Sequence, residues 1–430
     1  MQNFSADIAV IGGGAAGLTA AVAAARQCEN RGKSARVLLL EQGPRVGKKL
    51  LATGNGRCNL TNAHISSEAY HSLSPSGFPR LLSSFRSGQA LDFFARLGLL
   101  CRTEEAGRIY PYSGQASTVL DLLRQSCASL GVEECCGFPV EKLRRTKTGF
   151  LISSPEKSCA ARAVILATGG RAAPSPGGGT EGYALLSALG HSVTPLFPAL
   201  APVKSDPALT RALKGVRCRC AVTLLADGRT VKTETGELQF TETGLSGVCI
   251  FQLSRYAGEY QTLHTVNGRP CRVLECAVDL FPSFVAGSLE ELLCAGAAGN
   301  PLFSTEQLLC GLLHKRIAQC VLKSLSLPGD RPAGRLDSAA VKTLARHMKD
   351  WRFPVRGVLP WQNAQVTAGG VPLAEFDPLT LESRCAPGLY AAGEVLDVDG
   401  DCGGFNLHWA WSSGIRAGES AAGRLLSAAR

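Results

Sequence analysis

Short apolar runs separated by polar turns open the chain and predict alternating strands and helices. Residues 7–11 form an apolar run that predicts a strand, and the alanine-rich stretch 18–25 predicts a helix. A polar turn over residues 30–35 leads to a second apolar strand, residues 36–40, which Glu41 ends. A strand, a helix and a strand in this order predict a βαβ unit of a parallel sheet.

The same pattern returns later in the chain. The apolar stretch 162–170 predicts a strand that ends in Thr168-Gly169-Gly170, and residues 388–393 predict another strand. The pair Gly403-Gly404 then begins a predicted helix that runs through Trp411. We therefore expect the first and last parts of the chain to share one α/β domain.

Residues 195–358 interrupt this pattern with another kind of structure. Residues 217–225 and 228–241 alternate polar and apolar positions, which predicts strands. Helical periodicity is found in 288–296, 305–324 and 336–350, the last led by Asp337 as a cap. This inserted unit is expected to be a small sheet or barrel with a helical lobe.

Composition places the chain among globular proteins with a core, since it is 45% hydrophobic and 19% charged over 430 residues. No stretch reaches the 18 or more apolar residues that a membrane helix needs. The N-terminus lacks the basic segment of a secretory signal, and Asp7 interrupts its apolar run. We expect a cytoplasmic protein with no membrane partner.

The 17 cysteines include no C-x-x-C pair, so no metal site is predicted. Cys218-Arg-Cys220 and Cys135-Cys136 are too close together and too isolated for a four-ligand zinc site. Most cysteines are interpreted as small buried hydrophobic residues with reduced thiols. Redox chemistry at the vicinal or C-x-C pair is the alternative.

The formal net charge of +10 is spread along the sequence without a long basic run. Ordinary solubility explains it most simply, and an anionic cofactor or substrate can use part of the excess. Nucleic acid is therefore the less favoured partner, and the charge does not determine the oligomeric state.

The turn between the first predicted strand and helix carries G-x-G-x-x-G at Gly12, Gly14 and Gly17. In such a turn the first glycine permits a tight bend, the second lets a pyrophosphate approach the backbone, and the third lets helix and strand pack closely. Glu41 ends the second strand, where a carboxylate can accept hydrogen bonds from ribose hydroxyls. The strand, helix and acid around the motif predict a dinucleotide site.

Residues 43–62 favour a flavin over a plain nicotinamide nucleotide. A crossover helix is expected here in a nicotinamide domain, but the segment is rich in glycine and basic residues and ends in Asn59 and Asn62. It predicts a loop that lies along a long ligand and offers N–H groups and cations to its oxygens.

Several stretches carry a resemblance to a known family. They read VIGGGAAGLTAA, LLLEQGPRVGKKLLATGNGRCNLTN, GRIYPYSGQASTVLDLL, VILATGG, GELQFTETGLSG, AQVTAGGV, GLYAAGEVLDVDG and GGFNLHWAWSSG. Together they resemble the FAD proteins with two dinucleotide folds. More narrowly, they resemble the flavoproteins that include aminoacetone-oxidase-like enzymes and reductases of dehydro bile acids.

This resemblance implies a Rossmann-like FAD-binding domain in two parts, residues 1–194 and 359–430. Residues 195–358 would form an inserted substrate or lid domain, with the substrate in the cleft between it and the flavin. FAD is expected to bind without a covalent bond. The resemblance also implies a set of cofactor contacts, one of which, Val140, lies in a candidate strand over residues 139–141. The contacts are Gly12, Gly14, Ala15, Ala16, Gly17, Glu41, Gln42, Lys49, Thr53, Gly54, Arg57, Cys58, Asn59, Val140, Thr168, Gly169, Gly170, Gly393, Glu394, Gly403, Gly404, Phe405, Asn406 and Leu407.

The late helix is expected to act on the flavin ring. Its N-terminal end at Gly403-Gly404 would face the N1 and C2 carbonyl edge, where reduced flavin carries negative charge. Glu394 would accept from the ribityl hydroxyls. Residues 177–182 form either another loop near the flavin or a solvent turn.

Candidates for proton transfer are few. Glu242 is either a general acid or base or a surface glutamate, and Tyr110 and Tyr112 either donate to a substrate carbonyl or simply pack. Cys58 and Cys402 are interpreted as structural. No second G-x-G-x-x-G follows a strand in residues 195–358, so NAD(P)H is expected to use the substrate's cleft in turn.

The sequence thus predicts an FAD-dependent oxidoreductase. It would transfer hydride between NAD(P)H, flavin and an unsaturated or carbonyl-conjugated small molecule, such as a steroid or bile-acid dehydro intermediate. An amine oxidase of the aminoacetone-oxidase type, a flavin-dependent RNA-modifying protein and a redox sensor stay open as alternatives.

Overall fold

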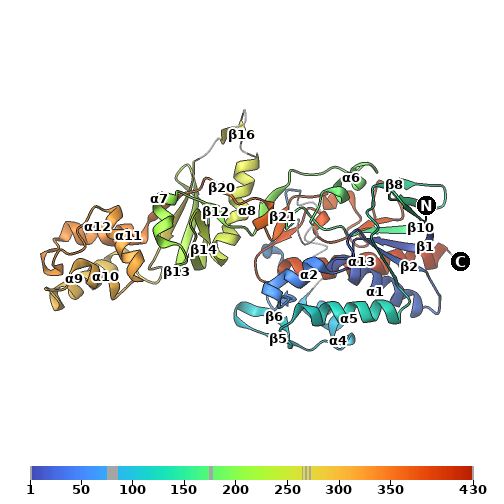
Figure 1. Ribbon diagram of the computed structural model, residues 1–430, viewed down its shortest axis with the longest axis horizontal. Coiled ribbons are helices and arrows are strands. Elements are labelled where there is room, and N and C mark those ends of the chain that lie inside the picture. Colours follow the sequence, from blue (N-terminus) through green and yellow to red (C-terminus); the bar gives the residue numbers. More distant parts are fainter. Residues whose placement is uncertain are drawn as a thin grey trace. The chain divides into compact units, whose positions relative to one another are not determined.

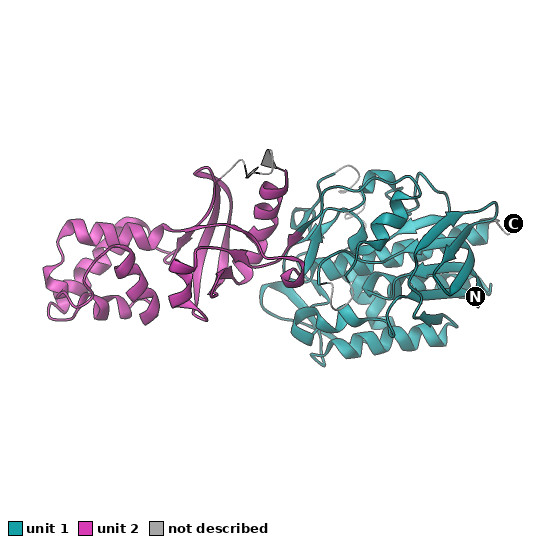
Figure 2. Ribbon diagram, turned by 45° about the horizontal axis from the view of Figure 1, so that its top comes forward, with its two compact units in different colours: residues 1–197, 365–430 teal, residues 198–364 magenta. Residues whose placement is uncertain are grey.

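The computed structural model describes residues 2–74, 86–173, 178–263, 265–266, 269–270 and 273–428. The chain divides into two compact units (Figure 2). Residues 1–197 and 365–430 form the first unit, and residues 198–364 form the second. The roles expected for these parts, cofactor binding and substrate enclosure, stay predictions.

The main sheet of the first unit has the strand order β7-β2-β1-β10-β9-β8, of which Figure 1 labels β2, β1, β10 and β8. Its parallel strands are β1 (Gln2–Ile11), β2 (Val37–Glu41), β7 (Glu133–Cys136), β10 (Lys157–Leu166) and β22 (Leu389–Ala391). Two antiparallel strands, β9 (Phe150–Ser153) and β8 (Lys142–Arg145), extend it. The centre of this sheet is apolar because buried parallel strands have no solvent face.

Helices cover this sheet, and two of them touch backbone to backbone. The helices α1 (Ala15–Glu29) and α13 (Phe405–Ala428) run side by side, and α5 (Ala116–Ser129) packs on α1 (Figure 1). A Cβ added to Gly414 would lie 2.3 Å from the carbonyl oxygen of Ala16, and one added to Gly418 would lie 2.3 Å from that of Ala20. The pair can approach this closely only because both positions lack side chains.

The remaining elements of the first unit are short. Its helices are α2 (Lys48–Ala52), α4 (Ser87–Arg96), α6 (Glu181–Ser187) and the 3-10 turns η1 (Thr53–Gly56), η2 (Ser67–Ala69), η3 (Glu105–Gly107), η7 (Leu373–Glu375) and η8 (Gly393–Val395). Its small strands are β3 (Thr61–Asn62), β4 (Tyr70–His71), β5 (Cys101–Thr103), β6 (Arg108–Pro111), β21 (Val366–Ala368) and β23 (Asp399–Gly400).

The predicted strands and helices of this unit are confirmed, with two corrections. Residues 43–62 are not one loop, because Lys48–Ala52 are good helix formers and make α2. Residues 139–141 are not a strand but the link between β7 and β8, since Pro139 has no N–H to donate to a ladder. Gly177 lies outside the described residues, whereas Glu181 and Gly182 begin α6.

The second unit is built on an antiparallel sheet with the order β19-β18-β13-β14-β15-β12-β20. Its strands are β12 (Val203–Lys204), β13 (Arg217–Ala226), β14 (Arg229–Phe240), β15 (Gly244–Ser246), β18 (Leu274–Asp279), β19 (Trp351–Pro354) and β20 (Gly357–Val358), with β11 (Phe197–Ala199), β16 (Thr265–Val266) and β17 (Arg269–Pro270) elsewhere. The two strands predicted at 217–225 and 228–241 are confirmed as β13 and β14. Phe240, Trp351 and Phe353 pack together in its core.

Helices complete the second unit. They are α7 (Pro207–Thr210), α8 (Val248–Leu263), α9 (Ala286–Gly299), α10 (Thr305–Cys310), α11 (Lys315–Ser324), α12 (Ser338–Lys349) and the turns η4 (Arg211–Leu213), η5 (Ala333–Arg335) and η6 (Trp361–Asn363). Asp337 caps α12 as predicted, because its side chain accepts from the N–H of Ala340. The helix predicted over 305–324 is wrong as a single element, since Gly311 ends α10 and the side chain of His314 caps α11.

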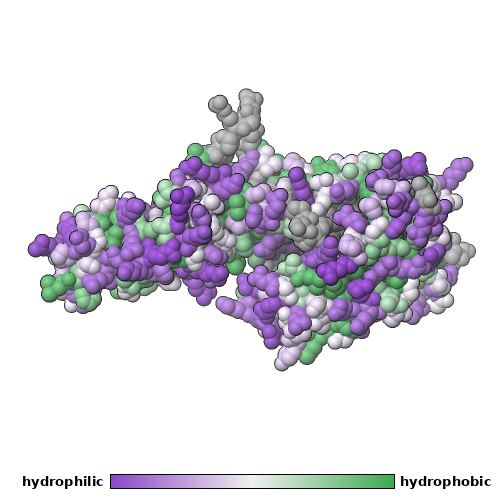
Figure 3. All heavy atoms as spheres, viewed as in Figure 1, coloured by the Kyte–Doolittle hydropathy of each residue, from purple (hydrophilic) through white to green (hydrophobic). Residues whose placement is uncertain are grey.

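Polar side chains cover most of the face shown in Figure 3, with apolar ones scattered between them. None of the helices in the described ranges is both long enough and apolar enough to cross a bilayer.

The contact between α1 and α13 gives a stability prediction. We expect Gly418→Ala to destabilise the first unit by about 2 kcal/mol, because its Cβ would overlap the Ala20 carbonyl. Urea unfolding followed by tryptophan fluorescence measures this, since Trp409 and Trp411 are buried on α13.

Gly423→Ala on the same helix is the matched control. Among the described residues no atom lies within 4 Å of its Cβ position, so this variant should gain up to about 1 kcal/mol from helix propensity. Equal stability of the two variants would contradict the packing argument.

Candidate cofactor site

The turn between β1 and α1 uses its three glycines in different ways. Gly12 has a φ of +107°, and a Cβ there would lie 2.4 Å from the carbonyl oxygen of Ala167. A Cβ on Gly17 would lie 1.8 Å from the carbonyl oxygen of Gly12. At Gly14, by contrast, no atom of the described residues lies within 4 Å of the Cβ position, so the backbone faces open space.

The N-terminus of α1 faces this space. Gly14 is the N-cap residue, no side chain of the described residues caps the helix, and its first turn holds no acid. The first N–H groups of a helix have no partner within the helix and carry partial positive charge. The end of α1 at Ala15 and Ala16 can therefore bind a phosphate group.

Glu41 lies at the edge of the same space. Its Oε2 accepts from the N–H of Gly13 at 2.8 Å, and its Oε1 accepts from the N–H of Gly43 at 2.7 Å. A carboxylate has about four acceptor positions, so the side chain is fixed and can still accept from hydroxyls. Gln42 beside it is exposed.

The link after β7 also reaches Glu41. The N–H of Phe138 donates to the Glu41 carbonyl at 2.9 Å, and Val140 packs against the core two residues later. Val140 therefore lies near the dinucleotide turn, although it is not part of a strand.

The end of β10 and the turn η8 form the next wall of the site. Gly169 has a φ of +75°, and the space at its Cβ position is open to 4 Å in the described residues. A Cβ on Gly170 would lie 2.8 Å from Oε1 of Glu394, and one on Gly393 would lie 2.9 Å from Cβ of Ala16. These contacts bring Gly170, Gly393 and Glu394 together with the start of α1.

Glu394 is held by partners from distant parts of the chain. Its Oε2 pairs with Nζ of Lys49 at 2.6 Å, and its Oε1 accepts from the N–H of Thr367 at 2.8 Å. The structure thus joins Lys49 and Glu394 to each other. Thr367, which the sequence analysis missed, also accepts from the N–H of Ala172 through its hydroxyl. In the sequence, the only indication that Thr367 belongs to the site was its position in the stretch AQVTAGGV.

Segment 53–59 packs against Tyr110. The guanidinium of Arg57 lies 4.1 Å from the centre of the Tyr110 ring and pairs with Glu104 at 2.5 Å. A Cβ on Gly54 would lie 3.5 Å from the ring, and the hydroxyl of Thr53 donates to the carbonyl of Leu50. The hydrogen bond from Arg57 lowers the pKa of Glu104, so this pair stays charged.

Cys58 is fully buried, and burial raises the pKa of its thiol to about 12. It is therefore a neutral thiol in the folded protein, which agrees with a structural role. Burial also raises the pKa of Cys402. Neither thiol has the low pKa of a nucleophile.

The N-terminus of α13 meets the segment that follows Cys58. A Cβ on Gly404, whose φ is +103°, would lie 2.5 Å from the carbonyl oxygen of Thr61. The side-chain oxygen of Asn59 accepts from the N–H of Gly404 at 3.2 Å. Asn62 donates to the carbonyl of Gly403 at 2.9 Å. This helix end is therefore anchored by both asparagines.

The first residues of α13 also hold the turn before it. Asn406 accepts from the N–H of Gly400 at 2.8 Å and donates to its carbonyl at 2.7 Å. The ring of Phe405 packs edge-on against Tyr70, and Leu407 is partly buried beside the core. Their expected contacts with the cofactor stay predictions.

The aspartates after Glu394 hold another segment of the protein in place. Buried Asp397 accepts from the Ser72 hydroxyl at 2.9 Å, from the N–H of Leu73 at 3.2 Å and from the N–H of Ser74 at 2.9 Å. Asp401 contacts Nε2 of His71 at 2.9 Å. These acids therefore fix residues 71–74 beside the late turn.

The candidates for proton transfer differ in exposure and in their partners. Glu242 belongs to the second unit and pairs with Nζ of Lys214 at 2.7 Å, with both side chains at least half exposed. The hydrogen bond from Lys214 lowers the pKa of Glu242, which favours the surface-glutamate interpretation over a general acid. Tyr112 is exposed, whereas Tyr110 is buried.

The site has unsatisfied polar atoms that a ligand can engage. Among the described residues no group hydrogen-bonds the buried hydroxyls of Thr168 and Tyr183. Buried hydroxyls normally have partners. Together with the open space at Gly14 and Gly169, they fit a long polar ligand along the ends of β1 and β10. No group of three His, Cys, Asp or Glu in the described residues is placed to hold a metal ion.

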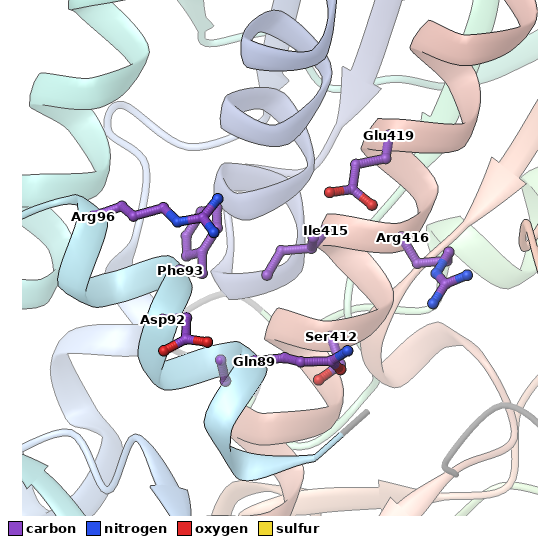
Figure 4. Close-up of a pocket in the computed structure, with 9 residues that line it drawn as sticks. Gln89, Asp92, Phe93, Arg96, Ser412, Ile415, Arg416 and Glu419 are labelled. Carbon is purple, nitrogen blue, oxygen red and sulfur yellow. The ribbon is translucent and has the colours of Figure 1, made fainter. Parts of the chain in front are cut away.

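A separate cavity of about 220 Å³ lies between α4 and α13 (Figure 4). It is lined by Gln89, Ala90, Asp92, Phe93, Arg96, Ser412, Ile415, Arg416 and Glu419. Burial raises the pKa of Glu419 there. None of the predicted cofactor contacts lines it.

The parallel sheet, the glycine turn and the uncapped helix end define a Rossmann-type dinucleotide-binding protein. The chain belongs to the HI0933-like Rossmann-domain family, whose sequence profile matches residues 6–420. The family expected from the sequence motifs is thereby confirmed.

Relatives match almost the whole chain. It is 39% identical over 417 residues to the 3-dehydro-bile acid delta(4,6)-reductase of Clostridium scindens, covering 97% of this chain and 99% of that protein. It is 30% identical to the ribosomal RNA dihydrouridine synthase of Escherichia coli, covering 96% of each. Its fold is similar to that of 3-ketosteroid-delta4-(5alpha)-dehydrogenase from Rhodococcus jostii RHA1, with a TM-score of 0.52, 18% identity and 98% coverage of both chains.

The role found for Asp397 gives a local prediction. Replacing Asp397 with Ala should cost about 3 kcal/mol, because three hydrogen bonds to a buried carboxylate are lost. Proteinase K should then cut within residues 71–74, with the sites mapped by mass spectrometry. The exposed Asp350→Ala is the control and should leave this segment protected. Unchanged protection in Asp397→Ala would show that other contacts hold the segment.

Proposed function

We propose that this protein is an FAD-dependent reductase that adds hydride from NAD(P)H to a carbon–carbon double bond conjugated with a carbonyl group. A 3-oxo bile acid with 4,6-unsaturation is the favoured substrate. The observation that carries this proposal is the 39% identity over 417 residues to the bile acid reductase, which covers both units.

FAD fits the geometry of the first unit. The open backbone at Gly14 and the end of α1 would hold the pyrophosphate, and Glu41 would accept from the adenosine ribose. Bound there, the flavin supplies hydride transfer at its N5 atom. The unsatisfied hydroxyls of Thr168 and Tyr183 support a ligand that continues past the end of β10.

The remaining contacts proposed for FAD follow the same wall. Glu394, fixed by Lys49 and Thr367, would accept from the ribityl chain with its remaining lone pairs. The anchored N-terminus of α13 would place N–H groups and partial positive charge at the pyrimidine edge of the ring. That end would stabilise negative charge that develops at this edge.

Proton delivery is proposed for Tyr110. The guanidinium of Arg57 lies over its ring beside segment 53–59, and its phenol can donate to a substrate carbonyl. Glu242 is the weaker candidate because Lys214 favours its carboxylate form. No second G-x-G-x-x-G follows a strand in residues 195–358, so NAD(P)H and the substrate are proposed to use the flavin in turn.

The cofactor proposal has a direct test. Gly14→Val should purify without FAD, because a side chain there would occupy the space proposed for the pyrophosphate, while no atom of the described residues lies within 4 Å of the Cβ position. Absorbance at the flavin band, relative to protein, measures the loading. Gly287→Val, another position with an open Cβ site in the described residues, should keep full FAD. A yellow Gly14→Val protein with one FAD per chain would refute the site.

The reaction is tested in two anaerobic steps. NADH or NADPH should bleach the oxidised-flavin absorbance, and a 3-oxo-4,6-dienoic bile acid should then restore it and gain two hydrogens by mass spectrometry. Bleaching without turnover of the bile acid would exclude this substrate but would still support a reductase. No bleaching, with hydrogen peroxide formed from amines in air, would establish the oxidase instead.

A uracil base in ribosomal RNA is the second candidate substrate. It is favoured by the 30% identity to the dihydrouridine synthase and by the charge of residues 198–364, which hold 20 Lys and Arg against 14 Asp and Glu. Uracil also holds a double bond conjugated with a carbonyl, so the same flavin chemistry would serve. Salt-sensitive binding of rRNA fragments and formation of dihydrouridine would select this substrate over the steroid.

A further inference from the structure

His408 is a buried titratable residue that the proposed reaction does not use. It belongs to the first turn of α13 and is fully buried. Its Nδ1 atom lies 2.9 Å from the hydroxyl oxygen of Thr61, and its Nε2 atom lies 3.3 Å from that of Ser412. Thr61 and Ser412 are buried as well. The three side chains therefore form a continuous hydrogen-bonded chain inside the first unit.

One end of this chain reaches the cavity between α4 and α13. Ser412 lines that cavity, as Figure 4 shows. Charged side chains from both helices line it too, namely Asp92, Arg96, Arg416 and Glu419. A polar cavity of this size can hold water. The hydroxyl of Ser412 can therefore exchange protons with water in the cavity.

The other end of the chain lies at the start of α13. The carbonyl oxygen of Thr61 would lie 2.5 Å from a Cβ on Gly404, and Asn59, two residues earlier, accepts from the N–H of Gly404. Thr61 is therefore beside the helix end proposed for the pyrimidine edge of the flavin. His408 follows Gly404 by four positions, which is about one helical turn.

Hydroxyl partners suit both the neutral and the charged form of the His408 ring. A hydroxyl can donate one hydrogen bond and accept two, and it rotates to suit its partner. With a proton on Nδ1, the neutral ring donates to Thr61 and accepts from Ser412. The charged ring donates to both hydroxyls. A carbonyl or an N–H group in place of Ser412 would suit only one of these two forms.

The charges around the ring determine which form is populated. The positive end of α13 disfavours a cation in the first turn of this helix. Among the described charged groups near this end, Glu394 pairs with Lys49, Asp401 contacts His71, and Arg108 lies opposite Asn62 in the pairing of β3 with β6. Negative charge added at the helix end would therefore favour the charged ring.

We propose that His408 takes up a proton from the cavity, through Ser412, when FAD bound to the first unit is reduced. This inference rests on the proposed function, in which hydride adds one negative charge beside the start of α13. Ser412 gives its hydroxyl proton to Nε2 and regains one from water in the cavity, which regains one from bulk solvent. No electrons move in this step, because hydride carries both of them. The proton returns by the same route when hydride leaves for the acceptor.

The pH dependence of the FAD reduction potential tests the proposal. Each proton taken up with two electrons changes the potential by about 30 mV per pH unit, which corresponds to a tenfold change in the equilibrium constant. Wild-type holoprotein should change by about 60 mV per pH unit over part of the range from about pH 6 to 8. His408→Gln, which can form hydrogen bonds but cannot ionise, should change by about 30 mV per pH unit.

The control is His314→Gln, which replaces an exposed histidine of the second unit and should keep the wild-type slope. Equal slopes in FAD-loaded wild type and His408→Gln would overturn this inference alone. A wild-type protein that binds no FAD would refute the proposed function and this inference with it.

Ser412→Ala tests the route and leaves the ring of His408 in place. After flash photoreduction of the bound FAD, a pH-indicator dye follows the uptake of protons from solvent. We expect this uptake to be at least about tenfold slower in Ser412→Ala than in wild type, because the hydroxyl that passes the proton is missing. Uptake at the wild-type rate would show that protons do not reach His408 through Ser412.

Discussion

Backbone contact without intervening side chains fixes the geometry of the first unit. The turn at Gly12 packs on Gly17, and α13 packs on α1 through Gly414 and Gly418, each at a distance that a Cβ would prohibit. Side chains can adjust to a shift by changing rotamer, but two backbones in contact cannot. The start of α13 is therefore held at a set place relative to the dinucleotide turn, although about 390 residues separate them in the sequence.

Hydrogen bonds and ion pairs then determine which charged groups face the space proposed for the cofactor. Glu394 is paired with Lys49, Asp397 accepts hydrogen bonds from residues 72–74, and Asp401 contacts His71. Lys49 thus offsets the charge of Glu394, and the uncapped end of α1 keeps its positive potential for an anionic ligand. A ligand there would use the remaining lone pairs of fixed carboxylates, at little further cost in side-chain entropy.

Local patterns in the sequence predicted the glycine turn and the parallel strands β1, β2, β10 and β22, since these depend on neighbours within a few residues, but they missed β7. The helix α8 was missed because its apolar start, Val248–Phe251, is rich in β-branched and aromatic residues, and its helical spacing is visible only once the buried face is known. The pairing of Lys49 with Glu394 and of Asn59 with Gly404 could not be predicted, because each joins residues more than 300 positions apart. The motifs predicted which segments belong to the site, but not which side chains hold one another.

The relatives also bear on what determines the acceptor. Two proteins named for a steroid and for ribosomal RNA each match this chain over at least 96% of its length. A glycine turn and a helix end that would hold a dinucleotide do not indicate whether the acceptor is a fused ring system or a uracil base. Both acceptors hold a double bond conjugated with a carbonyl, so the transfer step imposes the same electronic requirement on each.

Selectivity must then arise from shape and charge outside the dinucleotide turn, where a steroid demands an apolar surface and RNA demands cations for its phosphates. The excess of basic residues in the second unit counts toward RNA, whereas the higher identity along the whole chain counts toward the steroid. Charge alone reports on association and not on chemistry, so the identity carries the greater weight.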